Sequence, residues 1–123
     1  MYKRNIVLPD KNESFFLWGP RQAGKSSLLE SRYPEATRID LLSSENYIKY
    51  SVEPGRLFEE LTATKKMGIH RVVIDEIQKV PSLLDEVHRL IERKQFAFSL
   101  CGSSARKLKR GHANLLGGRA LRY

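Results

Sequence analysis

Short apolar runs alternate with amphipathic stretches along the chain. The apolar runs predict four buried strands, at residues 14–18, 38–42, 71–75 and 96–101. Helices are predicted at residues 25–32, 45–50, 56–66 and 83–92, and short helical turns at 104–110 and 113–116. Continuous apolar strands separated by helices are typical of a parallel sheet with helices on both faces. We therefore expect an α/β fold of three layers with about four parallel strands.

The helix starts carry capping signals. Ser43 or Ser44 can cap the helix at 45–50, and the sequence leaves this choice open. Ser82 precedes the helix with the clearest amphipathic pattern, whose apolar residues fall at positions 83, 84, 87, 90 and 91. Asp85 follows Ser82 by three residues, so the pair predicts a capping box at the positive end of that helix.

In open parallel sheets the ligand site lies at the carboxyl ends of the strands. The loops leaving the four predicted strands begin at Gly19, Ser43, Glu76 and Gly102. Three of these four loops carry residues with recognisable chemistry, so we expect the functional site at this edge.

Residues 19–26 match the phosphate-loop pattern G-x-x-x-x-G-K-[ST] at every fixed position, directly after an apolar strand and directly before a helix. Lys25 is expected on the β- and γ-phosphates of ATP, and the Ser26 hydroxyl on Mg²⁺. The glycines let backbone N–H groups turn toward the phosphates, and the helix dipole adds to the attraction. The expected nucleotide contacts are Gly19, Pro20, Arg21, Gln22, Ala23, Gly24, Lys25, Ser26 and Ser27.

Two carboxylates, Asp75 and Glu76, end the third predicted strand. Asp75 can hold Mg²⁺ through its water shell, because this cation prefers oxygen ligands. Glu76 can orient and deprotonate the water that attacks the γ-phosphate. Without other motifs, this pair would indicate only the end of a strand. Because it lies about 50 residues after a phosphate loop, it predicts a hydrolytic site.

Two weaker candidates follow the fourth strand. Ser103 or Ser104 can contact the γ-phosphate or the attacking water, or one of them can cap the next helical turn. Arg119 can stabilise charge in the transition state, in its own or a neighbouring subunit, although such an arginine is more often a surface residue.

Composition changes this picture in three respects. The 123 residues suit one domain, and no apolar run is long enough to span a membrane. The single Cys101 lies in an apolar run, which favours a buried thiol in a reducing cytoplasm.

All 14 acidic residues lie at or before Glu92, so the net charge of +8 sits in residues 93–123. This excess is compatible with nucleic acid, but a solvated or partner-covered surface is the favoured interpretation. The candidate contacts are Arg106, Lys107, Lys109 and Arg110.

Three segments, residues 14–29, 72–92 and 100–120, together resemble prokaryotic AAA-type P-loop ATP-binding proteins. The resemblance implies strand order 2-3-4-1, a sensor role for Ser103 and a Gly-Arg motif at Arg119. Relatives continue into a fifth strand, a helical lid and a C-terminal domain. We therefore expect one domain over residues 1–123, truncated at its C-terminus, with the fifth strand and the lid missing and the first strand left as an exposed edge.

These features predict Mg²⁺-dependent ATP hydrolysis that drives an unidentified partner or C-terminal module. The alternative is an ATP-binding regulatory or nucleic-acid-binding module with negligible hydrolysis. A GTPase is disfavoured because the sequence has no N-K-x-D motif. A small-molecule kinase is a remote option, since paired Asp75 and Glu76 suit water activation better. The oligomeric state is left open.

Overall fold

The structure is a computed structural model that describes residues 8, 13–20, 24–64, 68–103 and 120–122. The predicted helical turns at 104–110 and 113–116 lie outside these residues. Among the described residues, no helix is long and apolar enough to cross a membrane.

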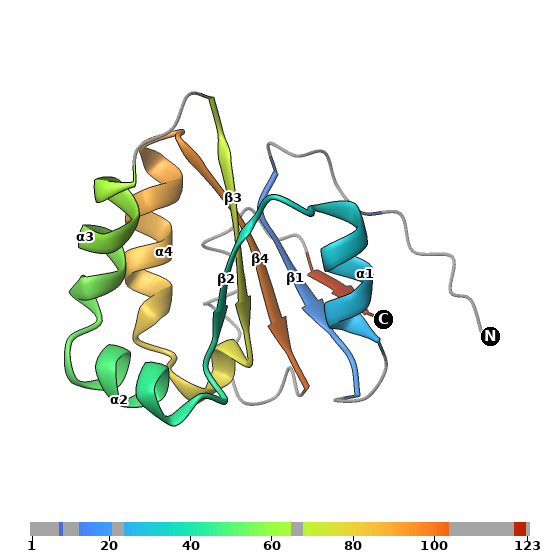
Figure 1. Ribbon diagram of the computed structural model, residues 1–123, viewed down its shortest axis with the longest axis horizontal. Helices are drawn as coiled ribbons and strands as arrows, with labels where there is room; N and C mark the ends of the chain where they lie inside the picture. The colour runs from blue at the N-terminus through green and yellow to red at the C-terminus, as the bar shows by residue number, and fades with distance from the viewer. Residues whose placement is uncertain (1–7, 9–12, 21–23, 65–67, 104–119, 123) are drawn as a thin grey trace.

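A five-stranded sheet with order β2-β3-β4-β1-β5 forms the centre of the molecule, and all of its strand pairs are parallel. Figure 1 shows the strands running side by side between the helices. The expected order 2-3-4-1 of the first four strands is confirmed. The strands are β1 Phe15–Trp18, β2 Thr37–Asp40, β3 His70–Asp75, β4 Phe96–Gly102 and β5 Ala120–Arg122.

The fifth strand corrects one expectation. We expected this strand to be missing and β1 to be an exposed edge, but β5 pairs with β1 from Phe16↔Ala120 to Trp18↔Arg122. The outer side of β1 carries backbone N–H and C=O groups that need partners. Three residues at the end of the chain are enough to supply them, so β5 replaces β1 as the edge.

Helices cover both faces of the sheet, as predicted (Figure 1). They are α1 Lys25–Arg32, α2 Ser44–Val52, α3 Gly55–Ala63 and α4 Leu83–Glu92, with a short 3₁₀ helix, η1 Ile77–Lys79. Because side chains alternate across a strand, β1 contributes to two cores. Phe15 and Leu17 pack with Leu29 of α1, whereas Phe16 and Trp18 pack in the core that contains the apolar residues of α3 and α4. Cys101 is buried, as predicted.

The two capping predictions have different outcomes. Ser43 caps α2, and its Oγ accepts a hydrogen bond from the Asn46 N–H at 3.4 Å. Ser82 stands at the N-cap of α4 but makes no side-chain capping hydrogen bond, so the predicted capping box is wrong. The carbonyls of Val80 and Pro81 accept from the N–H groups of Leu83 and Leu84, so the turn before α4 supplies acceptors for the first two N–H groups of this helix.

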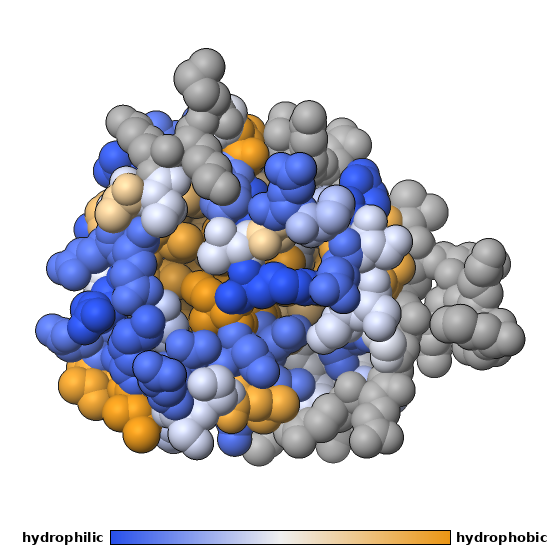
Figure 2. Space-filling model, viewed as in Figure 1, coloured by the Kyte–Doolittle hydropathy of each residue, from blue (hydrophilic) through white to orange (hydrophobic). Residues whose placement is uncertain are grey.

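Hydrophobic side chains reach the surface over α2, as Figure 2 shows. Ile48 is 59% exposed and Val52 is 75% exposed. Apolar atoms make up a large part of an ordinary protein surface, and these two residues form only a small patch. We therefore assign no role to these two side chains.

Candidate functional site

The phosphate loop joins the end of β1 to the start of α1. The Gly19 N–H donates to the carbonyl of Gly102 at 3.2 Å, which fixes the start of the loop against the end of β4. Gly24 has a left-handed backbone (φ 85°, ψ 16°), a conformation that glycine adopts without the clash of a Cβ atom. The first turn of α1 contains no acidic residue, so the positive end of its dipole is left for an anion.

Lys25 turns its side chain back into this loop. Its Nζ donates to the carbonyls of Gly19 at 2.9 Å and of Pro20 at 2.8 Å, and the residue is only 5% exposed. An ammonium group has three N–H donors. The two bonds to the backbone hold the charge at the loop, and the third donor can serve a phosphate oxygen.

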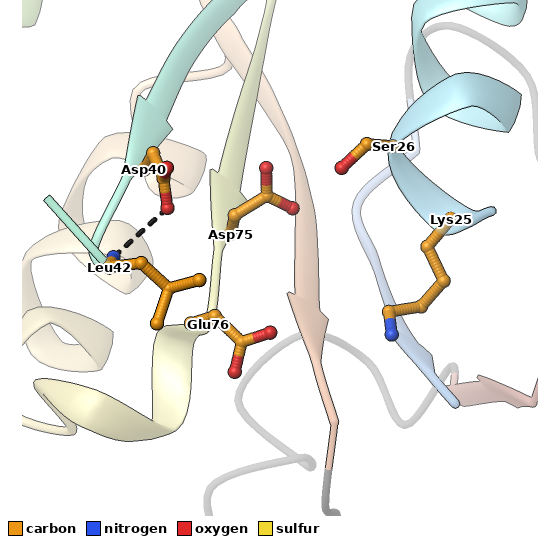
Figure 3. A pocket seen from close by; sticks show the side chains of 6 residues that line it. All are labelled: Lys25, Ser26, Asp40, Leu42, Asp75 and Glu76. Carbon is orange, nitrogen blue, oxygen red and sulfur yellow. Dashed lines mark hydrogen bonds between the residues drawn. The ribbon is translucent and has the colours of Figure 1, made fainter. Parts of the chain in front are cut away.

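A hollow of about 120 Å³, partly open to solvent, lies between the start of α1 and the ends of β2 and β3. Figure 3 shows the side chains of Ser26 and Asp75 pointing toward each other across it. The residues that line it are Lys25, Ser26, Asp40, Leu42, Asp75 and Glu76. Four predicted site residues from two distant segments therefore share one cavity at the carboxyl edge of the sheet.

Asp75 is held in a partly buried position. Burial raises the pKa of its carboxyl, and the nearby Asp40 carboxylate adds to the rise. The charge of Arg38 and a hydrogen bond with the Cys101 thiol oppose it. Arg38 is fixed at the same place, because its guanidinium donates to the carbonyl of Ser26 at 3.0 Å. A positive charge near Asp75 would favour its ionised form and so oppose the effect of burial.

Glu76 has an unusual backbone and a buried side chain. Its φ of 58° and ψ of 48° are left-handed, a conformation that costs a non-glycine residue about 1–3 kcal/mol. The residue is 6% exposed. Its Oε1 accepts hydrogen bonds from Gln78 Nε2 at 2.6 Å and from Ser103 Oγ at 3.1 Å. The carboxylate is therefore held by side chains from η1 and from the loop after β4.

The donor set fits a magnesium ion. Ser26 and Asp75 offer oxygen atoms to the same cavity, and Mg²⁺ is usually bound by one or two protein oxygens together with waters and substrate phosphates. Among the described residues there is no group of three His, Cys, Asp or Glu side chains that could enclose a metal by themselves. A cation that shares its ligands with a nucleotide suits this arrangement better than a fully protein-bound one.

The structure describes part of the predicted site only. Ser27 is exposed on α1 and does not line the hollow in the part of the chain that the structure describes. The remaining predicted residues lie outside the described residues: Arg21, Gln22, Ala23, Ser104, Arg106, Lys107, Lys109, Arg110 and Arg119.

Four residues at or beside the hollow were not predicted from the sequence: Arg38, Asp40, Leu42 and Gln78. Asp40 ends β2, so the strand-end rule that selected Asp75 could also have selected it. Leu42 follows two residues later in the same loop. No pattern marked Arg38 or Gln78, because their contacts depend on neighbouring elements.

Comparisons with known proteins agree with this fold. A family model described as an AAA domain matches residues 11–123. No curated protein matches the chain. The fold is similar to that of C. elegans PCH-2, with 18% sequence identity and a TM-score of 0.64; the match covers 92% of this chain and 36% of that chain. It is similar to the FIGL-1 AAA domain in complex with ADP, with 16% identity and a TM-score of 0.63, over 90% of this chain and 42% of that chain. It is also similar to Rhizobiales Trip13, with 18% identity and a TM-score of 0.60, over 92% of this chain and 45% of that chain.

These identities show the fold alone, and the chain spans less than half of each of the three chains. The family match covers nearly all of the chain, including the phosphate loop and the strand that ends in Asp75 and Glu76. The chain therefore belongs to the AAA domain family.

Proposed function

We propose that the chain binds ATP with Mg²⁺ in the hollow between α1, β2 and β3 and hydrolyses it to ADP and phosphate. The observation that carries this proposal is the shared cavity: Lys25 and Ser26 line it together with Asp75 and Glu76. Membership of the AAA domain family supports it. The FIGL-1 AAA domain, whose fold is similar, was solved in complex with ADP.

The phosphate loop would bind the nucleotide. Backbone N–H groups around Gly24 and the first turn of α1 would face the phosphates, and the third N–H of Lys25 would bind a β- or γ-phosphate oxygen. Lys25 is buried beside the carbonyls of Gly19 and Pro20, so its charge acts where water screens it less.

Ser26 and Asp75 would hold Mg²⁺, which when bound neutralises charge on the β- and γ-phosphates. Glu76 would orient a water for attack on the γ-phosphorus. The water oxygen forms the new P–O bond, the bond to the ADP oxygen breaks, and Glu76 takes the proton that the water loses. Gln78 and Ser103 both donate hydrogen bonds to the Glu76 carboxylate.

Several finer parts of the function stay predictions. Ser103 would act as the sensor of the γ-phosphate, because it contacts Glu76, and Arg119 would stabilise transition-state charge. Hydrolysis would drive an attached module or a partner in a cytoplasmic, prokaryotic protein. The alternative, an ATP-binding regulatory module with negligible turnover, uses the same cavity.

The test compares phosphate release by the wild type and by Glu76→Gln. We expect both to bind ATP, and the variant to lose most of the turnover, because an amide cannot take the proton. A matched control is Glu59→Gln, which changes an exposed glutamate on α3 and should leave turnover unchanged. Equal background release by the wild type and Glu76→Gln, with ATP bound to both, would favour the regulatory module over the enzyme.

A further inference from the structure

Gln78 joins two residues of the proposed site that directly follow different strands, Glu76 after β3 and Ser103 after β4. Its Nε2 lies 2.6 Å from Oε1 of Glu76 and 3.4 Å from Oγ of Ser103. Ser103 in turn donates to the same Glu76 oxygen at 3.1 Å. The amide, the hydroxyl and the carboxylate therefore form a closed set of contacts among η1, the loop after β4 and the end of β3.

The hydrogen-bond partners of the Gln78 amide favour one orientation. Its Oε1 is buried and has no hydrogen-bond partner among the described residues. A flipped amide would turn this oxygen toward the Glu76 carboxylate, where two acceptors would repel each other. Leaving a buried acceptor without a partner costs free energy, so the short bond to Glu76 is what retains the amide in this place.

The backbone fixes the Gln78 side chain as well. The left-handed turn at Glu76 starts η1, in which the Lys79 N–H donates to the Glu76 carbonyl at 3.0 Å. Ile77, between Glu76 and Gln78, is fully buried. On the other side, a Cβ atom on Gly102 would lie 2.6 Å from Oε1 of Gln78, so the absence of a side chain at Gly102 leaves space for the amide.

We propose that Gln78 is a positioning residue, which keeps the Glu76 carboxylate against Ser103 in the orientation that water activation needs. This inference rests on the proposed ATP hydrolysis. Gln78 acts through Glu76, since its N–H donor contacts that carboxylate. Loss of the donor should therefore slow the chemical step and leave the binding of Mg·ATP unchanged.

Gln78→Met tests this, because methionine has a similar length but no N–H group, and it removes the buried acceptor that has no described partner. We expect kcat to fall about tenfold with KM unchanged, which is the pattern for an interaction made only in the transition state. In a Glu76→Gln background the same substitution should cause no further loss, since residues that act as a unit are not additive. Lys79→Met, an exposed neighbour in η1, is the control.

A second measurement uses no Gln78 variant. In ¹⁵N-labelled wild type, we expect one glutamine side-chain amide to exchange slowly with solvent, and this protection to be lost in Glu76→Ala. The positioning role would be overturned by an unchanged kcat in Gln78→Met or by an unprotected Gln78 amide. It would also be overturned if Gln78→Met lowered kcat as much in the Glu76→Gln background as in the wild type. Equal phosphate release by the wild type and Glu76→Gln would instead contradict the proposed hydrolysis itself.

Discussion

The Oγ atom of Ser103 donates a hydrogen bond to Oε1 of Glu76 at 3.1 Å, although the two residues are 27 positions apart in the sequence. β3 and β4 are neighbouring parallel strands, so their carboxyl ends meet at one edge of the sheet. The contact places a hydroxyl group beside the carboxylate that we propose activates water.

Ser103→Ala should lower kcat by roughly ten- to a hundredfold, because a hydrogen bond to a charged group contributes roughly 1.5–3 kcal/mol and each 1.4 kcal/mol is a factor of ten. ATP binding should change little. The control is Ser99→Ala, also on β4, whose Oγ accepts from Arg71 at 3.1 Å and makes no described contact with Glu76. Turnover equal to that of the wild type in Ser103→Ala would show that the contact has no catalytic role.

Gly102→Ala should destabilise the fold by about 1–3 kcal/mol, the usual cost of overpacking a core. A Cβ atom there would overlap the Trp18 ring, at 2.7 Å from Cε3, and would press on Gln78 Oε1. Urea unfolding measures the change. Gly55→Ala is the matched control, since nothing lies within 4 Å of its Cβ position, and it should be neutral or slightly stabilising. Equal midpoints for the two variants would contradict the close packing at Gly102.

Asp75→Asn should stabilise the fold in the absence of nucleotide and impair function. Burial raises the pKa of Asp75, so the folded state binds its proton more tightly than the unfolded state does. Ionisation therefore lowers stability as the pH rises, and at pH 7 the uncharged asparagine avoids this cost. We expect a thermal midpoint a few degrees higher, measured by calorimetry.

The same variant should need more Mg²⁺ for half-maximal turnover. Loss of an outer-shell contact usually lowers metal affinity or activity roughly 10–100-fold, and we expect the Mg²⁺ requirement to rise by a factor in that range. Asp40→Asn is the control, because Asp40 lines the same hollow but is exposed, so its change in stability should be smaller. A lower midpoint in Asp75→Asn would show that the ionised carboxylate stabilises the fold.

Tyr50 and Glu60 should make the fold sensitive to acid. Burial alone would raise the pKa of Glu60, but hydrogen bonds from Tyr50 and Lys49 outweigh it and the net pKa lies below the ordinary value of 4.5. The folded pKa is therefore lower than the unfolded one. The contribution to stability is complete above about pH 4.5 and is lost as the pH falls through the folded pKa.

Tyr50→Phe removes the bond that the hydroxyl donates to Glu60 Oε1 at 2.5 Å. We expect a loss of about 1 kcal/mol at pH 7, allowing for the partial exposure of Glu60, and a smaller loss at pH 3. Denaturant unfolding at both pH values measures it. Tyr47→Phe, an exposed tyrosine on α2, should have little effect at either pH. A loss for Tyr50→Phe that does not shrink in acid would contradict this account.

Most of the fold could be predicted from the sequence because its strands are continuous apolar runs. The predicted helix at residues 25–32 coincides with α1, and the order of the first four strands follows the family pattern. β5 was missed because three residues of mixed character at 120–122 carry no periodicity that separates a strand from a loop. The Ser82 cap was also predicted wrongly, because the sequence does not show that the preceding turn supplies acceptors for the first two N–H groups of α4.

The residues of the candidate site also fall into those that the sequence predicted and those that it did not. Lys25 and Ser26 could be predicted from the phosphate-loop pattern, and Asp75 and Glu76 from their place at the end of a strand; all four line one hollow. Gln78 could not, because its contact requires the left-handed turn at Glu76 and the approach of Ser103 from another strand. The choice between Ser103 and Ser104 as the sensor stays a prediction: Ser103 contacts Glu76, and Ser104 lies outside the described residues.

The most direct test of the central claim is the thermal midpoint of the wild type and of Lys25→Ala, titrated with Mg·ATP and, for comparison, Mg·GTP. ATP at 100 times its Kd should stabilise the wild type by about 2.7 kcal/mol. Lys25→Ala should lose this shift because it removes the buried ammonium at the phosphate loop, and Lys79→Ala, an exposed lysine, should keep it. A wild-type midpoint that does not move with ATP, or an equal rise in Lys25→Ala, would contradict nucleotide binding at this site.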